Sequence, residues 1–352
     1  MLKLNKNMKY RIISNEIEFK GIENDWQALY EKDKENTVFQ SFEFNYFSWI
    51  YNLVNAKNTL AIVIAYDSDK IKAIFPFYID KRCRLRFIND LHADFCDSVS
   101  IDSVNFSEII LFLKSSFKIY YFHLVNIKKE SSLLDYSNIS SSNVISDVDY
   151  SVLNLNKGTF PNNCLNYKSK QKTEFRRILK LNKDKDYKII DYTNTKFPKF
   201  QIEILRKKMI LLGIRDENFL SNSQLLLIEE LYLSGKLVLS IVSQRGVVNA
   251  ISFIINSPLE YLVWIDMYDD SKMINLYNYI LAISSLSVKN SVKINFGRGS
   301  YNYKIKNFLP LEKNLFSLYI FSSKYIEFKF FFKRRVIQLM RRVYNKINFI
   351  FL

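Results

Sequence analysis

The sequence predicts an α/β protein, or α+β by the stricter label, with mixed and largely antiparallel sheets flanked by helices. The chain has 352 residues, of which 48% are hydrophobic and 24% charged, so it can form two domains with separate cores. Apolar runs of strand length alternate with longer segments at helical spacing. Three strand candidates, 236–243, 247–256 and 261–267, follow one another through short connections, as in an antiparallel meander.

The first predicted half covers residues 1–145. Ser41 is a residue suited to capping a helix that follows it, and Pro76 interrupts the second strand of a predicted hairpin. The elements predicted in this half are a strand at 10–14, helices at 16–31 and after 41, strands at 59–66, 71–79 and 85–88, a helix at 106–113 and a strand at 120–125.

The second predicted half covers residues 146–322. The stretch 130–148 before it is rich in Ser and Asn, and we expect a loop or linker there. Besides the meander, the elements predicted in this half are a strand at 150–155, a helix at 163–182, a strand at 187–191, helices at 197–211 and 221–234, a helix after 268, and strands at 292–296 and 315–320.

The tail, residues 323–352, is predicted to be a basic amphipathic helix. Val336, Leu339, Met340, Val343 and Ile347 share one face on a helical wheel. The arginines at 334, 335, 341 and 342 fall on the other. Such a helix can cover its own domain, or it can lie on an anionic membrane surface or a partner. We favour the first interpretation, because most amphipathic helices cover a core.

Charge and cysteine content narrow the class of protein. The formal net charge of +16 suits nucleic acid, an anionic membrane surface or phosphorylated substrates. The three cysteines are scattered without metal-ligand spacing, which favours a reducing compartment. We find neither a signal peptide nor an apolar stretch long enough to span a membrane. We therefore expect a cytoplasmic protein, which a membrane-bound tail would hold at the inner face of the membrane.

Several common catalytic patterns are absent from the sequence. It contains no dinucleotide-binding or P-loop glycine motif and no nucleophile elbow. With only two histidines, a zinc site built on histidine ligands is not expected, and we predict no metal.

The stretch NFGRGSYNYK, residues 295–304, is the most informative one for chemistry. Two of the seven glycines stand here on either side of Arg298, and Tyr303 and Lys304 end the run. A Gly-x-Gly pair indicates a backbone geometry that other residues avoid. A cation and a phenol beside such a turn, at a strand end, are suited to binding an anion or an acyl donor. The alternative is a tight turn with solvated ends.

Blocks of sequence in a fixed order resemble the CelD-like acetyltransferases, a branch of the GNAT superfamily related to the Fem-type aminoacyltransferases. The resemblance covers about residues 20–310, and each block is short. The matching blocks are Asp25–Leu29, Phe39–Ser41, Ile74–Phe77, Asp94–Asp97, the basic helix around 168–180, the paired strands at 239–252 and the Arg-Gly-x-x-x-Tyr-Lys spacing that ends at Lys304.

The resemblance implies two GNAT-like halves and transfer of an acyl group from acetyl-CoA or another acyl-CoA to an amine or amino sugar. It also implies a role in making cell-surface polysaccharide or envelope material in a bacterium. In that interpretation Tyr303 protonates the leaving thiolate, while Arg298, Gly299 and Lys304 hold the donor.

Two further groups are candidates for the site. Lys168, Lys172 and Arg176 recur every four residues, so they share one helical face that would attract polyanions such as CoA phosphates or tRNA. The alternative is a solvated face. For the base that deprotonates the amine, Asp97 and Asp266 rank equally, the first in a loop and the second at a strand end.

The sequence also departs from the family pattern. Asn295 stands where the family usually has an acid, and the helix after Tyr268 lacks the Gly-containing turn that presents N–H groups to the donor pyrophosphate. Two alternatives therefore stay open. One is a Fem-type transferase with tRNA as the donor carrier. The other is a non-catalytic, membrane-associated scaffold of a surface-polysaccharide pathway.

Overall fold

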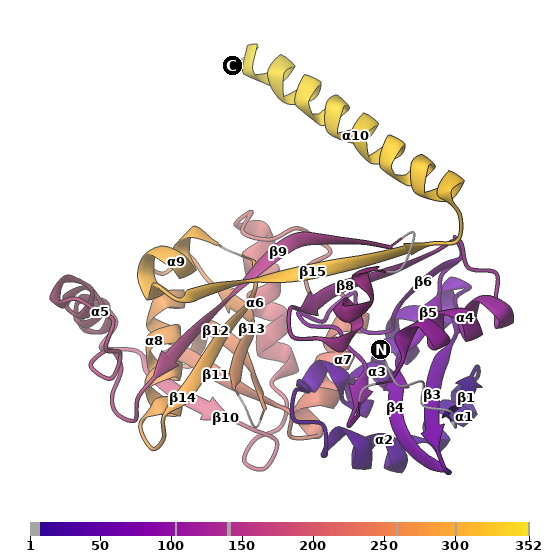
Figure 1. Ribbon diagram of the computed structural model, residues 1–352. Coiled ribbons are helices and arrows are strands. Elements are labelled where there is room, and N and C mark those ends of the chain that lie inside the picture. The colour runs from indigo at the N-terminus through magenta and orange to yellow at the C-terminus, as the bar shows by residue number, and fades with distance from the viewer. Residues whose placement is uncertain (1–7, 103, 139–141, 258–259, 300, 351–352) are drawn as a thin grey trace.

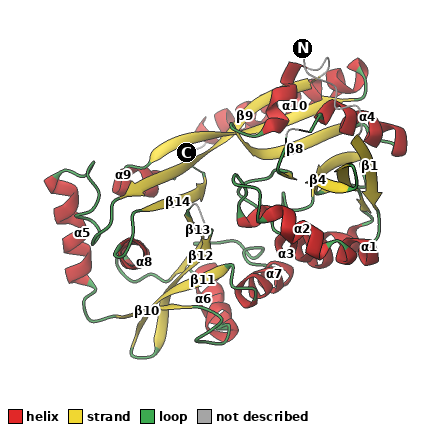
Figure 2. Cartoon of the chain, turned by 60° about the horizontal axis from the view of Figure 1, so that its bottom comes forward, coloured by secondary structure: helices red, strands yellow, loops and turns green. Residues whose placement is uncertain are grey.

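A computed structural model describes residues 8–102, 104–138, 142–257, 260–299 and 301–350. Within these ranges it does not describe the side chains of 136–138, 338 and 341–350. Two sheets run through the molecule, with helices packed on them (Figures 1 and 2). The architecture agrees with the predicted mixture of largely antiparallel sheets and flanking helices.

The larger sheet has the order β10-β11-β12-β13-β14-β9-β15-β8-β6-β5-β2 and runs through both halves. β9 (Ser142–Leu155) and β15 (Leu311–Phe321) are its longest strands and pair with each other (Figure 1). They join the halves, because β9 also pairs with β14 of the second half and β15 with β8 of the first. The other strands are β10 (Asp186–Ile190), β11 (Leu237–Gln244), β12 (Val247–Asn256), β13 (Tyr261–Tyr268), β14 (Val292–Arg298), β8 (Tyr121–Lys128), β6 (Arg84–Phe87), β5 (Phe77–Ile79) and β2 (Thr59–Leu60).

The smaller sheet has the order β1-β3-β4-β7 and belongs to the first half. Its strands are β1 (Met8–Ile13), β3 (Ile62–Asp67), β4 (Lys70–Phe75) and β7 (Val99–Ser100). Pro76 separates β4 from β5, as its missing N–H predicts. A cluster of aromatic and aliphatic side chains, including the fully buried Trp26 and Phe19, packs under this sheet.

Helices cover the sheets in both halves, and Ser41 caps α3 by accepting a hydrogen bond from the N–H of Phe44 at 3.2 Å. The helices of the first half are α1 (Glu16–Gly21), α2 (Glu23–Tyr30), η1 (Val38–Gln40), α3 (Phe42–Ser48), η2 (Trp49–Leu53), η3 (Val54–Ala56), α4 (Phe106–Ser116) and η4 (Ser132–Asn138). Those of the second are α5 (Ser169–Leu181), α6 (Lys199–Leu211), α7 (Asn222–Leu233), α8 (Ile274–Ser287), α9 (Asn302–Phe308) and α10 (Lys324–Ile350).

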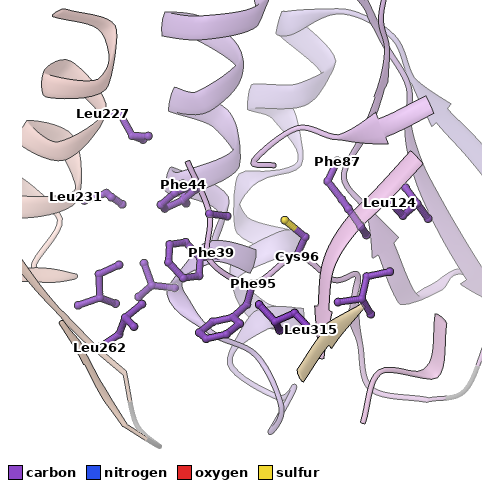
Figure 3. Packing of buried hydrophobic residues seen from close by; sticks show 14 of the residues in the cluster. Phe39, Phe44, Phe87, Phe95, Cys96, Leu124, Leu227, Leu231, Leu262 and Leu315 are labelled. Carbon is purple, nitrogen blue, oxygen red and sulfur yellow. The ribbon is translucent and has the colours of Figure 1, made fainter. Parts of the chain in front are cut away.

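The largest core cluster contains side chains from both halves. Phe39 and Phe44 of the first half face Leu227 and Leu231 of α7 and Leu262 of β13 (Figure 3). The Phe39 and Phe44 rings meet edge to face at 5.0 Å. Because apolar surface from both halves is buried in one cluster, the halves are held against each other.

Two segments differ from the sequence-based expectation. The stretch 130–148, expected as a loop or linker, contains η4 and the start of β9, so that expectation was wrong. Residues 142–148 pair only with β15, and a strand paired on one side needs no continuous apolar pattern. The predicted boundary at residue 146 falls inside β9. α9, which the sequence analysis did not predict, follows the Gly-x-Gly turn.

The tail forms the long helix α10, which extends away from the body beyond the end of β15 (Figure 1). The interpretation that it covers its own domain is corrected for the described part of the helix, where Phe328, Phe332 and Leu339 are exposed and the contacts with the body come from Glu327, Phe330, Phe331 and Arg334. The predicted faces for Arg341, Arg342, Val343 and Ile347 lie outside the side chains that the structure describes. Over the described residues, no helix combines the length and the apolar character needed to cross a bilayer.

Candidate functional site

A gap between two parallel strands forms the centre of the candidate site. β13 and β14 pair only at Tyr261–Ile294 and Leu262–Asn295, and towards their carboxyl ends the strands are no longer paired. α8 connects them and packs on the sheet through Tyr277, Ile280 and Ile283. Beyond this pairing, β13 stays paired with β12 and β14 with β9, so the two strands separate from each other. Side chains beside this separation are candidates for chemistry.

Asp266 of β13 stands at this gap in a network of hydroxyl groups. Its Oδ1 accepts a hydrogen bond from Ser252 Oγ at 2.9 Å, and its Oδ2 accepts one from the hydroxyl of Tyr279 on α8. Burial raises the pKa of Asp266, although the Tyr279 and Ser252 hydroxyls and the positive charge of Lys304 oppose that shift. An acid with a raised pKa beside a phenol is a group that can accept and return a proton.

Tyr303 of α9 extends this network towards solvent. Its hydroxyl lies 3.4 Å from that of Tyr279, so Asp266, Tyr279 and Tyr303 form one chain of polar atoms. Burial raises the pKa of Tyr303, with the negative charge of Asp266 adding to the shift, so the phenol keeps its proton at neutral pH. Tyr303 also borders a cavity of about 380 Å³ at the start of α8. Tyr303 therefore connects the buried network to that cavity.

Lys304 lies beside these groups but points into the fold. Its Nζ donates to the carbonyl of Phe296 and lies 5.0 Å from the centre of the Tyr301 ring. Only 5% of the residue is exposed, and burial lowers the pKa of its ammonium group. Lys304 supplies positive charge near Asp266 and Asp94.

The Gly-x-Gly turn joins the two halves. The N–H of Arg298 donates to Asp94 Oδ2 at 3.1 Å, and Arg298 Nε lies 3.9 Å from Asp94 Oδ1. Gly297 has φ of +72°, and a Cβ there would lie 2.4 Å from Asp94 Oδ2. Glycine is required at 297 because both the backbone conformation and the approach of Asp94 exclude a side chain. Gly299, with φ of +96°, donates its N–H to the carbonyl of Asp149 at 2.7 Å.

Asn295, which stands where an acid was expected, makes hydrogen bonds that hold the local structure. It is fully buried, donates from Nδ2 to Glu260 Oε1 at 2.9 Å and accepts the N–H of Gly297 at 2.8 Å. Glu260 in turn meets Lys293 at 2.8 Å. Asn295 therefore fixes the turn before Arg298.

The start of α8 is lined by carboxylates. Asp269 accepts hydrogen bonds from Asn249 Nδ2, from the N–H of Ser271 and from Lys208 Nζ, each at 3.0 Å. Burial favours the neutral acid, but these hydrogen bonds outweigh it and lower the pKa of Asp269. Asp270 lies 3.1 Å from the same lysine. The loop before α8 therefore carries two carboxylates that share one lysine, and Asp269 also holds the backbone N–H of Ser271.

The other predicted site residues lie elsewhere. Asp97 borders a separate cavity with Asp33, and it accepts the N–H of Ser98 at 2.8 Å. Burial raises the pKa of Asp97 to about 6.

Lys172 and Arg176 lie on α5, and Lys168 is its N-cap residue. This helix packs against α8 and lies at the edge of the molecule in Figure 1. Lys168 and Arg176 are exposed, Lys172 is half-buried, and Arg176 Nη2 donates to Asn162 Oδ1 at 3.1 Å. The end of α5 reaches the loop before α8, since Asn182 Nδ2 lies 3.3 Å from the carbonyl of Lys272.

Sequence reasoning missed three members of this site. Tyr279 and Ser252 carry no local signal, because they lie within continuously buried stretches of α8 and β12. Asp94 was noted beside Asp97 but was not ranked as a site residue, yet its carboxylate accepts the N–H of Arg298. Across the described residues, no group of three His, Cys, Asp or Glu side chains is placed to hold a metal ion.

Comparisons with known proteins support the fold. No family model and no curated protein matches the chain. Among solved structures, FemX has 9% identity and a TM-score of 0.57, over 88% of this chain and 96% of that one. The C-terminal domain of a putative lysylphosphatidylglycerol synthetase from Agrobacterium fabrum has 9% identity and a TM-score of 0.56, over 86% and 93%.

A tandem GNAT protein from the clavulanic acid biosynthesis pathway has 5% identity and a TM-score of 0.50, over 89% of this chain and 98% of that one. At such identities the likeness concerns the fold alone. The chain has a GNAT-like fold of two tandem halves, as expected, while the CelD-like branch within that superfamily stays a prediction.

Proposed function

We propose that this chain transfers an acyl group from an activated donor to an amine, in the gap between β13 and β14. The observation that carries the proposal is the chain of polar atoms from Asp266 through Tyr279 to Tyr303, which ends at the cavity beside α8. Amide formation releases one proton from the amine, and the leaving atom takes up one proton. Asp266 at one end is a suitable acceptor and Tyr303 at the other a suitable donor.

The residues have distinct roles in this proposal. The amine nitrogen forms a bond to the acyl carbon, and the bond from that carbon to the leaving oxygen or sulfur breaks. Tyr303 donates its proton to the leaving atom, and Tyr279 connects it to Asp266, which receives the proton of the amine. Lys304 is a positioning residue. Its ammonium group donates a hydrogen bond to the carbonyl of Phe296 and is therefore directed into the fold rather than towards the reacting atoms.

For the donor, the start of α8 favours an aminoacyl ester carried by tRNA over acyl-CoA. Asp269 and Asp270 share one cation, Lys208, so their two negative charges are only partly balanced where a CoA pyrophosphate would bind in the family that the sequence resembles. The exposed cations Lys168 and Arg176 of α5, a helix whose end touches the loop before α8, supply positive surface for a polyanionic carrier. FemX and the lysylphosphatidylglycerol synthetase domain share the fold, and Fem-type enzymes use aminoacyl-tRNA.

Acyl-CoA is the second candidate donor. The observation that favours it is the gap itself, since acids near strand ends line the central cleft of GNAT-like halves and Asp266 has that position. In either case we propose an amine of an envelope or cell-surface precursor as the acceptor.

The test is the melting temperature of the purified chain with aminoacylated tRNA, uncharged tRNA, acetyl-CoA or CoA, followed by donor consumption in the presence of a panel of amines. A ligand that binds only the native state raises the melting temperature. We expect a rise with tRNA that Lys168→Glu with Arg176→Glu removes, and donor consumption that Tyr303→Phe abolishes.

If acetyl-CoA alone raised the melting temperature, the donor would be acyl-CoA and the tRNA proposal would be wrong. No rise with any donor, together with no donor consumption, would contradict transfer and leave the scaffold alternative.

A further inference from the structure

α10 has an inner face that holds it to the body. Phe330 lies 5.0 Å from the ring of Tyr319, and Glu327 accepts a hydrogen bond from Asn143 Nδ2 at 3.0 Å. One turn beyond Phe330, Arg334 Nη2 lies 3.5 Å from Asp147 Oδ1. These contacts use one side of the first part of the helix, so the remaining sides face away from the body.

The outer face of α10 is apolar and exposed. Tyr325, Phe328, Phe332 and Leu339 follow one another at spacings of three, four and seven residues, which places them on one stripe. Their exposed fractions are 64%, 67%, 59% and 59%. Phe330 and Arg334 lie on the opposite side of the helix. A stripe of large apolar side chains directed away from its own fold indicates a surface made to contact something else.

Cations flank this stripe on both sides. At about 100° per residue, Lys329 and Lys333 lie on one side of the stripe and Lys324 and Arg335 on the other, and all four are exposed. Lys329 Nζ lies 4.8 Å from the ring centre of Tyr325, so its stem follows the apolar surface. An apolar stripe between two rows of cations is typical of a helix that lies in the interface of an anionic bilayer.

We propose that α10 binds an anionic membrane surface, with the stripe Tyr325–Phe328–Phe332–Leu339 in the acyl–headgroup boundary and the flanking cations on lipid phosphates. Pairing of this face with a second copy is less favourable, because two such stripes would bring like charges together. The proposal does not depend on the transfer chemistry, and it would hold the site near a membrane.

The experiment is sedimentation of the full chain with vesicles of phosphatidylcholine alone and of phosphatidylcholine with roughly one third phosphatidylglycerol. The chain is expected to sediment with the anionic vesicles, to stay in solution with the neutral ones and to be released by salt. Phe328→Glu with Phe332→Glu and Leu339→Glu should weaken binding at least about tenfold, because it removes apolar burial and three units of charge complementarity.

A matched control separates the position of the charges from their number. Leu165→Glu with Phe200→Glu and Leu211→Glu makes the same charge change at side chains that are 81%, 71% and 86% exposed on the body. This control should bind as the unchanged protein does, and both variants should keep the melting temperature, which confirms that they fold.

The proposal would be overturned if both variants lost vesicle binding equally, or if the α10 variant bound anionic vesicles as well as the unchanged protein. A dimer in analytical ultracentrifugation that only the α10 variant dissociates, with no vesicle binding, would assign the stripe to a second copy.

Discussion

The two halves contain the same arrangement of two parallel strands joined by a helix, but they use the space between the strands differently. β6 and β8 pair at only two positions, as do β13 and β14. In the first half, the loop 89–98 fills the space beyond the pairing. The N–H of Cys96 donates to the carbonyl of Asn126, and Asn126 Nδ2 donates to that of Ala93, each at 3.0 Å.

In the second half the corresponding space is lined by polar side chains. Asp266, Tyr279 and Tyr303 are hydrogen-bonded to one another there, and the same loop of the first half reaches over to place Asp94 on Arg298. In the proposed function, the second half therefore carries the chemistry and the first half supports it.

The largest effect is expected for Tyr303→Phe. Removing the donor at the end of the polar chain should lower the rate of acyl transfer about 100- to 1,000-fold. Tyr277→Phe is the matched control, because Tyr277 is a buried tyrosine of the adjoining α8. Single-turnover consumption of the donor measures both, and equal rates in the two variants would remove Tyr303 from the reaction.

Asp266→Asn should lower the rate by about ten- to 100-fold and change its pH dependence. Because burial raises the pKa of Asp266, the rate of the unchanged protein should fall on acidification at a pH above the usual carboxyl range. Asparagine cannot take up the proton, so this acid limb should disappear from the pH–rate profile. A limb that persists in the variant would assign it to another group.

Gly297→Ala tests the contact between the halves. A Cβ 2.4 Å from Asp94 Oδ2 at φ of +72° should lower the free energy of unfolding by about 2–4 kcal/mol. Gly246→Ala is the control, since Gly246 has φ of +79° but open space around its Cβ, and should cost about 1–2 kcal/mol. Urea unfolding measures the two, and equal costs would show that the approach of Asp94 does not matter.

The smallest effect is expected for Asp97→Asn, which tests the supporting half. Burial raises the pKa of Asp97 to about 6, so the folded chain binds this proton more tightly than the unfolded chain. Its contribution to stability is then fully present below the unfolded pKa and is lost as the pH rises towards 6.

The asparagine variant should therefore gain up to about 2 kcal/mol over the unchanged protein at pH 7, but not at pH 4. Urea unfolding at both pH values measures this difference. If the variant gained the same stability at pH 4 as at pH 7, proton binding at Asp97 would not be the cause of the gain.

Regular elements with a strong local pattern could be predicted from the sequence. The meander of β11, β12 and β13 and the helices α6 and α7 lie within about two residues of the predicted ranges, because their apolar periodicity is continuous. The start of β9 could not be predicted, because its residues 142–148 owe their strand conformation to β15, more than 150 residues away in sequence.

For the site, sequence reasoning found the residues that carry an unusual local pattern and missed those selected by packing. Tyr303, Lys304 and Arg298 follow two closely spaced glycines, which made them visible. Asp97 was chosen beside Asp94 by residue type alone, and only the tertiary structure shows which of the two carboxylates faces Arg298.

The fold class, the elements with clear periodicity and the amphipathic character of the tail could be predicted from the sequence, because these depend on spacing within one segment. The polar chain in the gap between β13 and β14, the pairing of Asp269 with Lys208 before α8 and the outward direction of the apolar stripe of α10 became visible in the folded chain. Each of these features depends on contacts between segments that are distant in sequence. Such contacts follow from the packing of the whole core rather than from local spacing.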